Sequence, residues 1–354
     1  MTTNPITVLV VDDSALMRQI LTEMLNGADD IKVIASAPDP IVARELIKQH
    51  SPNVVTLDVE MPKMDGIVFL ERIMTLRPIP VIMVSSLTSQ GAESTLRALE
   101  LGAVDYVTKP TTDLQKGMQG LAEELRAKVR IAAKAKLRPY VIQARPTFVK
   151  KDITAAAAAA PIDKIIAIGA STGGVEAITQ LLGGMPPESP PIIITQHMPE
   201  KFTASFAQRL NSVTPLRVSE AKDADRVLPG HAYIAPGGFH LELGKTAGSY
   251  FCKVHQDAPV SGHRPSVDVL FRSVAKVAGR QSIGVILTGM GRDGAEGLLE
   301  MRKAGAQTIG QDEGTCVVYG MPKAAYDLGA VEMQSPLKDI NKQLIKLLNI
   351  TAVT

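Results

Sequence analysis

Short apolar runs alternate with stretches of helical spacing along most of this chain. Between residues 1 and 110, five runs read as buried strands, and apolar residues between them recur every three or four positions. The expected strands are Ile6–Val11, Lys32–Ser36, Asn53–Leu57, Pro80–Val84 and Val104–Val107. The expected helices are Ser14–Leu25, Pro40–Gln49, Gly66–Leu76 and Gln90–Leu101. This alternation predicts an α/β domain, with a parallel sheet covered by helices on both faces.

The same alternation returns in the second half of the chain. Lys164–Ile168, Pro191–Thr195 and Ser282–Leu287 are apolar runs with the length of strands. After the first run comes a glycine-rich turn and then a stretch with helical spacing. The third run is likewise followed by a turn and a helical stretch. We therefore predict a second α/β domain with a doubly wound, mostly parallel sheet.

The composition changes between the two α/β regions. Residues 126–151 hold nine basic side chains and no acidic one, and six alanines follow at 155–160. Six alanines are too few for a stable isolated helix, and nearby prolines stiffen the chain. We predict a first domain at 1–125, a linker at 126–161 and a second domain at 162–350. The basic linker could bind nucleic acid or an acidic partner, but neither aromatic interleaving nor a helix-turn-helix pattern supports this.

The overall composition is that of an ordinary globular protein. Of the 354 residues, 45% are hydrophobic and 21% are charged. The formal net charge of +2 implies no general attraction to nucleic acid or to anionic membranes. The two cysteines, Cys252 and Cys316, are far apart in the sequence and lack metal-ligand spacing. So few cysteines fit a reducing compartment and a fold without structural disulfides. Without a long apolar run or a leader pattern, we expect a cytoplasmic protein with no membrane insertion.

Acidic residues follow two of the strands in the first half. Asp12 and Asp13 come after the first strand, and Asp58 comes after the third. Because the carboxyl ends of parallel strands share one edge, these carboxylates are expected to meet, and such hard oxygen ligands suit Mg²⁺. Ser85 and Lys109 follow the fourth and fifth strands and could hold phosphoryl oxygens there. Taken singly, each aspartate could instead be a helix N-cap.

A glycine-rich turn opens the second domain. Ser171 lies between an apolar strand and a helical stretch, within Gly169-Ala-Ser-Thr-Gly-Gly174. The Gly-x-Ser-x-Gly spacing is that of a nucleophile elbow. A plain helix cap or a phosphate-binding turn would also fit this run. The run lacks the lysine of a P-loop and the spacing of a dinucleotide fingerprint.

Two further polar residues follow strand ends of the second domain, and with Ser171 they could form a catalytic triad. His197 could take the proton of the serine hydroxyl, and Asp293 could orient the imidazole. The chain order Ser–His–Asp differs from that of standard α/β-hydrolases. Alternatively, His197 could be structural, and Asp293 could cap the helix that follows it. His263 is a rival base, and Arg264 beside it could bind an anion in the site.

Motifs of the first half closely resemble the receiver domain of response regulators. They are Val10-Val-Asp-Asp-Ser14, Leu57-Asp-Val-Glu-Met-Pro-Lys-Met-Asp-Gly66 and Tyr106-Val-Thr-Lys-Pro110. The resemblance implies a flavodoxin-like (βα)5 fold in which Asp58 accepts a phosphoryl group from a histidine kinase. It also implies that Asp12, Asp13 and Asp58 hold Mg²⁺. By the same resemblance, Lys109 contacts the phosphoryl group and Ser85 is the switch hydroxyl.

Motifs of the second half resemble the catalytic domain of chemotaxis protein-glutamate methylesterases (CheB). They are Ile168-Gly-Ala-Ser-Thr-Gly-Gly174, Thr195-Gln-His-Met-Pro199, His263-Arg-Pro-Ser-Val-Asp268, Leu287-Thr-Gly-Met-Gly-Arg-Asp-Gly294 and Gly320-Met-Pro322. The resemblance implies that Ser171 is the nucleophile, His197 its base and Asp293 the orienting acid. Backbone N–H groups near Thr172 or Met290 would then hold the oxyanion.

The two resemblances together imply a phosphorylation-activated serine hydrolase. Its substrates would be γ-glutamyl methyl esters, and selected glutamines, of methyl-accepting chemoreceptors. A chemotaxis histidine kinase would be the phosphodonor, and the esterase reaction would need no cofactor. Two alternatives are a receiver-controlled transcription factor and a nucleotide-binding module. The first is disfavoured because residues 162–350 contain strands throughout and are longer than a small helical DNA-binding domain.

Overall fold

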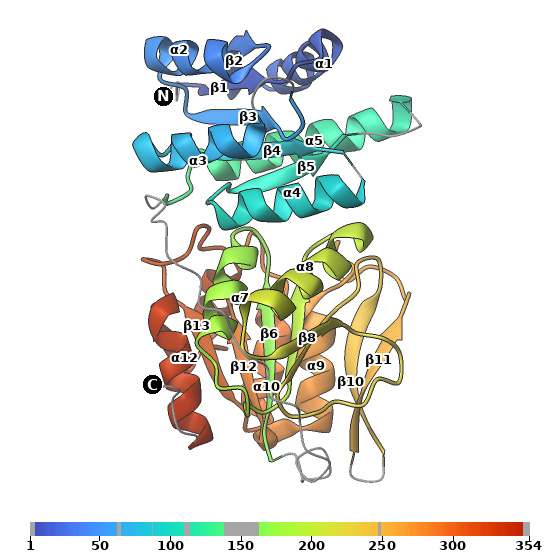
Figure 1. Cartoon of the computed structure of the whole chain (residues 1–354). Coiled ribbons are helices and arrows are strands. Elements are labelled where there is room, and N and C mark those ends of the chain that lie inside the picture. The colour runs from blue at the N-terminus through green and yellow to red at the C-terminus, as the bar shows by residue number, and fades with distance from the viewer. Residues whose placement is uncertain are drawn as a thin grey trace. The chain divides into compact units, whose positions relative to one another are not determined.

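The chain folds into two compact units, Met1–Gln143 and Ala144–Thr354, each with a parallel sheet of its own (Figure 1). This computed structural model describes residues 4–61, 65–86, 88–109, 114–137, 163–246 and 249–349. Strands and helices alternate in both units, which confirms the predicted α/β class. Within the described ranges, no helix combines the length and apolar character needed to cross a membrane.

The first unit is a five-stranded parallel sheet in the order β2-β1-β3-β4-β5. Its strands are β1 (Ile6–Val11), β2 (Ile31–Ala37), β3 (Val54–Asp58), β4 (Val81–Ser85) and β5 (Asp105–Thr108). Its helices are α1 (Ala15–Asn26), α2 (Pro40–His50), α3 (Gly66–Leu76), α4 (Ser89–Glu100) and α5 (Leu114–Ala132). The strand order reverses between β1 and β3, and in such sheets ligands bind at the carboxyl ends beside that point.

Helix α5 reaches into the predicted linker. Leu125, Val129 and Ala132 are fully buried, and α5 contacts α1, β4 and β5 of its own unit. Arg130 also makes two hydrogen bonds, of 2.7 and 2.8 Å, to the carboxylate of Asp30. The first residues of the proposed linker at 126–161 therefore pack as a helix on the first unit. From residue 138 onwards the proposed linker lies outside the described residues.

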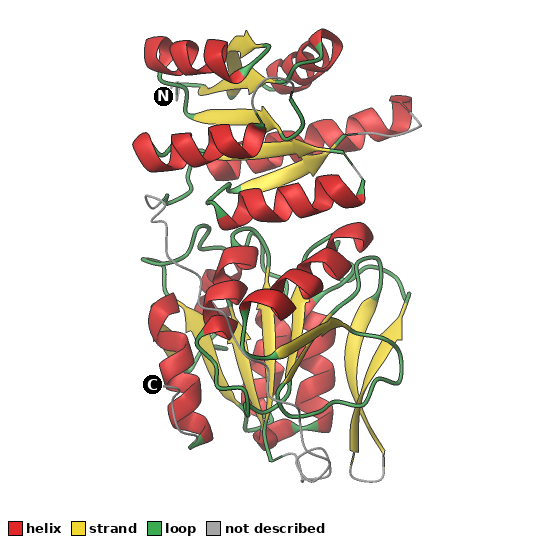
Figure 2. Cartoon of the chain, in the orientation of Figure 1, coloured by secondary structure: helices red, strands yellow, loops and turns green. Residues whose placement is uncertain are grey.

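The second unit is built on a seven-stranded sheet in the order β14-β13-β12-β6-β7-β9-β8, whose strand pairs are parallel (Figure 2). Its strands are β6 (Ile165–Ala170), β7 (Ile192–Gln196), β8 (Arg217–Glu220), β9 (His231–Ile234), β12 (Ser282–Ile286), β13 (Gln307–Gln311) and β14 (Met333–Ser335). A separate antiparallel hairpin joins β10 (His240–Thr246) and β11 (Ser249–His255). The order reverses between β6 and β12, as in a doubly wound sheet.

Helices cover both faces of this second sheet. They are α7 (Gly174–Gly183), α8 (Glu200–Val213), α9 (Val267–Val277), α10 (Ala295–Lys303), α11 (Met321–Asp327) and α12 (Leu337–Leu348). Helix α7 contacts α8 and α12, whereas α9 packs against α10 and against the β10–β11 hairpin. Figure 1 shows α7 and α8 in front of the sheet and α9 behind it. The sheet is thus a buried layer, and its side chains form the core of the unit with those of the helices.

Strand β6 is the centre of this sheet and is buried along its whole length. It runs past the predicted end at Ile168 and includes Gly169 and Ala170. The extension follows from pairing on both sides, because Gly169 pairs with Ile286 of β12 and with Thr195 of β7. The glycine-rich turn consequently starts two residues later than predicted, at the carboxyl edge of the central strand.

Candidate active site and phosphorylation site

Three carboxylates gather at the carboxyl edge of the first sheet. One oxygen each from Asp12, Asp13 and Asp58 lies within 4.8 Å of the others. The ammonium of Lys109 is 2.8 Å from an oxygen of Asp58 and 3.0 Å from one of Asp12. Ser14, rather than an aspartate, is the N-cap of α1. The structure thus brings together the acidic cluster and the lysine that the sequence singled out.

The electrostatics of this cluster fit a divalent cation. Burial raises the pKa of Asp58 to about 6; Lys109 opposes this rise, and the neighbouring Asp12 adds to it. Burial also opposes the charge of Lys109, but its ion pairs with Asp58 and Asp12 outweigh burial and raise its pKa. One ammonium is therefore shared by two carboxylates, and that of Asp13 lies close to both. Hard oxygen donors with excess negative charge are the ligands that Mg²⁺ prefers.

Ser85 lies at the same edge, but its hydroxyl is turned towards α4. The hydroxyl oxygens of Ser85 and Thr95 are 2.7 Å apart, and both are within hydrogen-bond distance of the Gly91 carbonyl. The backbone N–H of Lys109 donates to the carbonyl of Ser85 at 2.8 Å. The Ser85 backbone is thus at the cluster, while its hydroxyl would have to exchange partners to reach a phosphoryl group on Asp58.

Ser171 follows β6 directly, in a turn that is held at several points. Its N–H donates to the Thr288 carbonyl at 3.1 Å. Its carbonyl accepts from the Gly174 N–H at 2.7 Å and from the side-chain amide of Gln196 at 2.9 Å. Gly173 has φ 78°, a left-handed conformation that favours glycine, and it begins α7 without a side-chain cap. The Ser171 hydroxyl is therefore not used as a cap of this helix.

His197 lies beside this turn and contacts Asp293. Ala170 and Gln196 are paired across β6 and β7, and the His197 N–H donates to the Ala170 carbonyl at 3.2 Å. The Nε2 atom of His197 is 2.8 Å from Oδ2 of Asp293. Its Nδ1 atom is buried and has no hydrogen-bond partner among the described residues. The carboxylate thus takes one ring nitrogen and leaves the other without a partner, and the structure shows no hydrogen bond between His197 and the Ser171 hydroxyl among the described residues.

Asp293 is buried in a ring of hydrogen-bond donors. Besides His197, it accepts from the Ser266 hydroxyl at 2.8 Å and from the N–H groups of Val267 and Asp268 at 2.7 and 3.1 Å. These N–H groups begin α9, whose dipole favours a negative charge there. Burial opposes ionisation of Asp293, but His197 and the other donors outweigh it and lower the pKa. Asp293 does not cap the helix that follows it, since α10 begins at a glycine without a side-chain cap.

The two segments proposed for the oxyanion site are tied together by Thr288. Its hydroxyl donates to the Thr172 carbonyl and accepts from the Val318 N–H, each at 3.0 Å. The next residue, Gly289, donates its N–H to the Val318 carbonyl at 3.1 Å. Met290 follows in the same loop and is 45% exposed. The backbones of Thr172 and Met290 thus belong to two loops that one buried threonine joins.

His263, the rival base, stacks on His197. The ring centroids are 3.8 Å apart and the planes differ by 9°. Burial, with a smaller contribution from His197, lowers the pKa of His263 to about 4, so its ring is neutral at neutral pH. The Asp293 carboxylate binds His197 and not His263. The geometry therefore favours His197 as the base.

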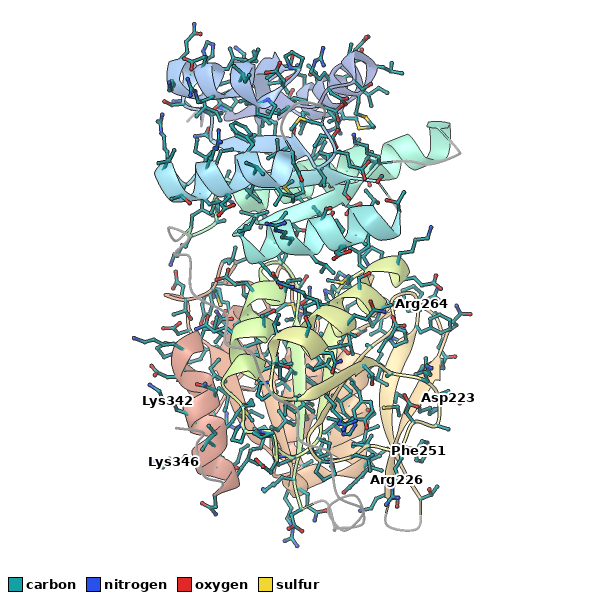
Figure 3. The ribbon with its side chains drawn as sticks, viewed as in Figure 1. Asp223, Arg226, Phe251, Arg264, Lys342 and Lys346 are labelled. Carbon is teal, nitrogen blue, oxygen red and sulfur yellow. The ribbon has the colours of Figure 1, made fainter. Side chains whose placement is uncertain are left out.

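Arg264 is engaged with the main chain near the end of the β10–β11 hairpin (Figure 3). Its Nη1 atom donates to the carbonyls of Gln256 and Asp257 at 3.1 and 3.2 Å. These bonds give the guanidinium a structural role in the segment after β11. An anion-binding role for Arg264 would use its remaining donors.

Polar residues that the sequence analysis did not single out support the site. Gln196 holds the Ser171 carbonyl, Ser266 binds Asp293, and the Gln311 side chain accepts from the Thr288 N–H at 2.8 Å. Gln196 and Gln311 are buried and each is the last residue of its strand, at the carboxyl edge of the sheet. Their place at strand ends of a parallel sheet is the signal that could have identified them.

Comparisons with known proteins agree on both units. Residues 166–344 match the CheB methylesterase family, and residues 8–119 match the response regulator receiver domain. The chain is 56% identical to the protein-glutamate methylesterase/protein-glutamine glutaminase of Salmonella typhimurium over 343 residues, which is 96% of each chain. It is 55% identical to that of Photorhabdus laumondii over 354 residues, which is 99% of each chain.

A solved structure also resembles the second unit. The CheB methylesterase catalytic domain of Thermotoga maritima is 40% identical, with a TM-score of 0.51, and the match covers 52% of this chain and 98% of that one. The sequence matches, which extend over nearly the whole chain, include both the receiver and the methylesterase parts. The chain therefore belongs to the CheB methylesterase family, with a receiver domain ahead of the catalytic domain.

Proposed function

We propose that this chain is a phosphorylation-activated protein-glutamate methylesterase. It removes methyl groups from γ-glutamyl methyl esters of methyl-accepting chemoreceptors and deamidates selected glutamines. The observation that carries the proposal is the buried pair of His197 and Asp293 at the strand ends beside Ser171. The names of the relatives, which cover nearly the whole chain, supply the substrate class.

In the proposed reaction, Ser171 attacks the ester carbonyl while Nδ1 of His197 takes its proton. Asp293 holds the ring and stabilises the imidazolium that forms. The N–H groups of Thr172 and Met290 hold the oxyanion, at about 2.7–4 kcal/mol for each donor. His197 then protonates the departing methanol, or ammonia when the substrate is a glutamine. Water, activated by the same imidazole, releases the glutamate carboxylate.

The receiver part accepts a phosphoryl group on Asp58 from a chemotaxis histidine kinase. Asp12, Asp13 and Asp58 are the residues that would hold Mg²⁺, which would neutralise charge on the transferred group. Lys109 already contacts two of these carboxylates and would bind a phosphoryl oxygen. Ser85 would give up its contacts with α4 to do the same. Phosphorylation adds a charge of about −1.5 to −2, which these two side chains would sense.

The proposed partners are the cytoplasmic helices of chemoreceptors and the kinase, with the enzyme in the cytoplasm. The esterase reaction itself, as proposed, uses only side chains and backbone groups of this chain. The alternatives of a transcription factor and a nucleotide-binding module are not favoured, because residues 166–344 match a methylesterase family.

The test is methanol release from methylated receptor membranes by the full-length protein. Ser171→Ala should lower the rate at least about 10³-fold, because the nucleophile is lost. Ser219→Ala, an exposed serine on the edge strand β8, is the matched control. Equal rates for wild type and Ser171→Ala would overturn the proposal. In the same assay, Asp58→Asn should reduce the ratio of the rates with and without a phosphodonor to one.

A further inference from the structure

The contact between His263 and His197 has no part in the reaction described above. The His197 side chain is 9% exposed, and the parallel His263 ring covers one of its faces. The main chain holds His263 in place independently of His197. Its N–H and carbonyl both bond to Val260, at 2.9 and 3.1 Å, in a short antiparallel bridge. The backbone of His263 is thus anchored, and its ring presents a flat surface to the imidazole.

A hydrogen bond restrains only one of the two ring nitrogens of the base. The bond from Nε2 to Asp293 fixes one edge of the ring, whereas the plane of the ring depends on the side-chain torsions of His197 and on what packs against its faces. At the opposite edge, Nδ1 has no hydrogen-bond partner among the residues described. A tilt of the ring would change the direction in which Nδ1 points while the contact with Asp293 is kept. A parallel ring at 3.8 Å opposes that tilt.

We propose that His263 is a positioning residue, whose stacked ring holds the His197 imidazole in the plane that directs Nδ1 to Ser171. This inference rests on the proposed function. It assigns His263 neither proton transfer nor substrate binding. Hydrogen bonds between imidazoles form in the ring plane, and two parallel rings cannot make one with each other.

The neutral state of His263 suits this role. During the reaction His197 becomes an imidazolium, and a second positive charge at stacking distance would oppose it. Asp293 is the charged group that attracts the imidazolium from its edge, while the ring of His263 faces it uncharged. A flat aromatic ring without a charge should therefore replace His263, whereas an aliphatic side chain of similar size should not.

The experiment compares His263→Phe, His263→Leu and His263→Ala in the full chain. Leu and Ala should lower kcat for methanol release about three- to tenfold with KM unchanged, since an aromatic contact at the base is lost. Phe should restore kcat to within about twofold of wild type, because it keeps the stack. His231→Ala is the matched control, since His231 also stacks on a ring, that of Tyr233, at the amino end of β9. It should keep the wild-type kcat.

A second measurement does not depend on the receptor substrate. A sulfonyl fluoride forms a bond to Oγ of Ser171 and releases fluoride, and His197 takes the hydroxyl proton. Labelling rates should follow the same order, with wild type and Phe above Leu and Ala. If wild type labels but releases no methanol, the proposed function fails while this order still tests the inference.

Three results would overturn the inference. One is a rise in KM with unchanged kcat, which would make His263 a substrate contact. Another is equal kcat for the Phe and Leu variants, which would show that a flat ring is not needed. The third is equal labelling rates for all variants. Thermal unfolding of each variant identifies any that fail to fold. If His263→Ala fails to fold, His263→Phe and His263→Leu can still be compared with each other.

Discussion

The two units place their chemistry at equivalent points of two sheets but treat a buried carboxylate in opposite ways. The strand order reverses between β1 and β3 in the first sheet and between β6 and β12 in the second. The candidate residues follow these strands in both. Asp58 and Asp293 are each only 2% exposed. Yet the pKa of Asp58 is raised to about 6, whereas that of Asp293 is lowered.

Hydrogen-bond donors, rather than burial, explain the difference. Asp293 accepts from one hydroxyl, two helix N–H groups and an imidazole, all within 3.1 Å. Asp58 shares the ammonium of Lys109 with Asp12 and accepts a long backbone bond of 3.3 Å from Glu60. Donors that favour the charged form offset the cost of burial. Asp293, whose oxygens are fully hydrogen-bonded, can orient a base. Asp58, which has few donors, can receive a cation and a phosphoryl group.

The largest effect should come from Asp293→Asn, which removes the carboxylate whose hydrogen bonds are complete. An amide cannot accept from every donor around it, and it favours the wrong tautomer of His197 without stabilising the imidazolium. We expect kcat for methanol release to fall about 10³–10⁴-fold with little change in KM. Asp339→Asn, a partly exposed position on α12, is the control. A loss of less than tenfold would contradict the orienting role.

A smaller effect should come from Asp58→Asn, which should change the free energy of unfolding of the first unit. The pKa of Asp58 is about 6 in the folded chain and about 3.9 when unfolded. Below about pH 4 the group is protonated in both states and costs no stability, and the cost grows as the pH rises to about 6. Without divalent metal, Asp58→Asn should therefore raise the free energy of unfolding of the first unit at pH 7 by about 1–2 kcal/mol, after discounting for solvent screening.

The measurement is thermal unfolding in a chelator between pH 4 and pH 8. The difference between Asp58→Asn and wild type should vanish near pH 4. Adding Mg²⁺ should stabilise wild type more than the variant, because the metal binds the folded carboxylates. A difference that does not depend on pH would contradict the assigned cause of the raised pKa.

The sequence predicted where these sites lie better than how they are held. Strand ends could be recognised from apolar runs, and parallel pairing then put Asp12 with Asp58 and Ser171 with His197. The contact of Asp293 with the first turn of α9 could not be predicted, because a carboxylate after a strand equally suits the helix that follows. The direction of the Ser85 hydroxyl depends on packing against α4, which periodicity does not specify. The same holds for the stack of His263 on His197.

The smallest effect should come from Ser266→Ala, which removes one donor from Asp293 and the N-cap hydroxyl of α9. Loss of an N-cap costs about 1 kcal/mol, which for a unit of this size lowers its Tm by about 2–4 °C. Because the N–H groups of Val267 and Asp268 still bind the carboxylate, kcat should fall only about two- to fivefold. Ser212→Ala, an exposed serine on α8, controls for loss of a hydroxyl. A loss of kcat as large as that of Asp293→Asn would show that the hydroxyl, and not the helix N–H groups, keeps Asp293 ionised.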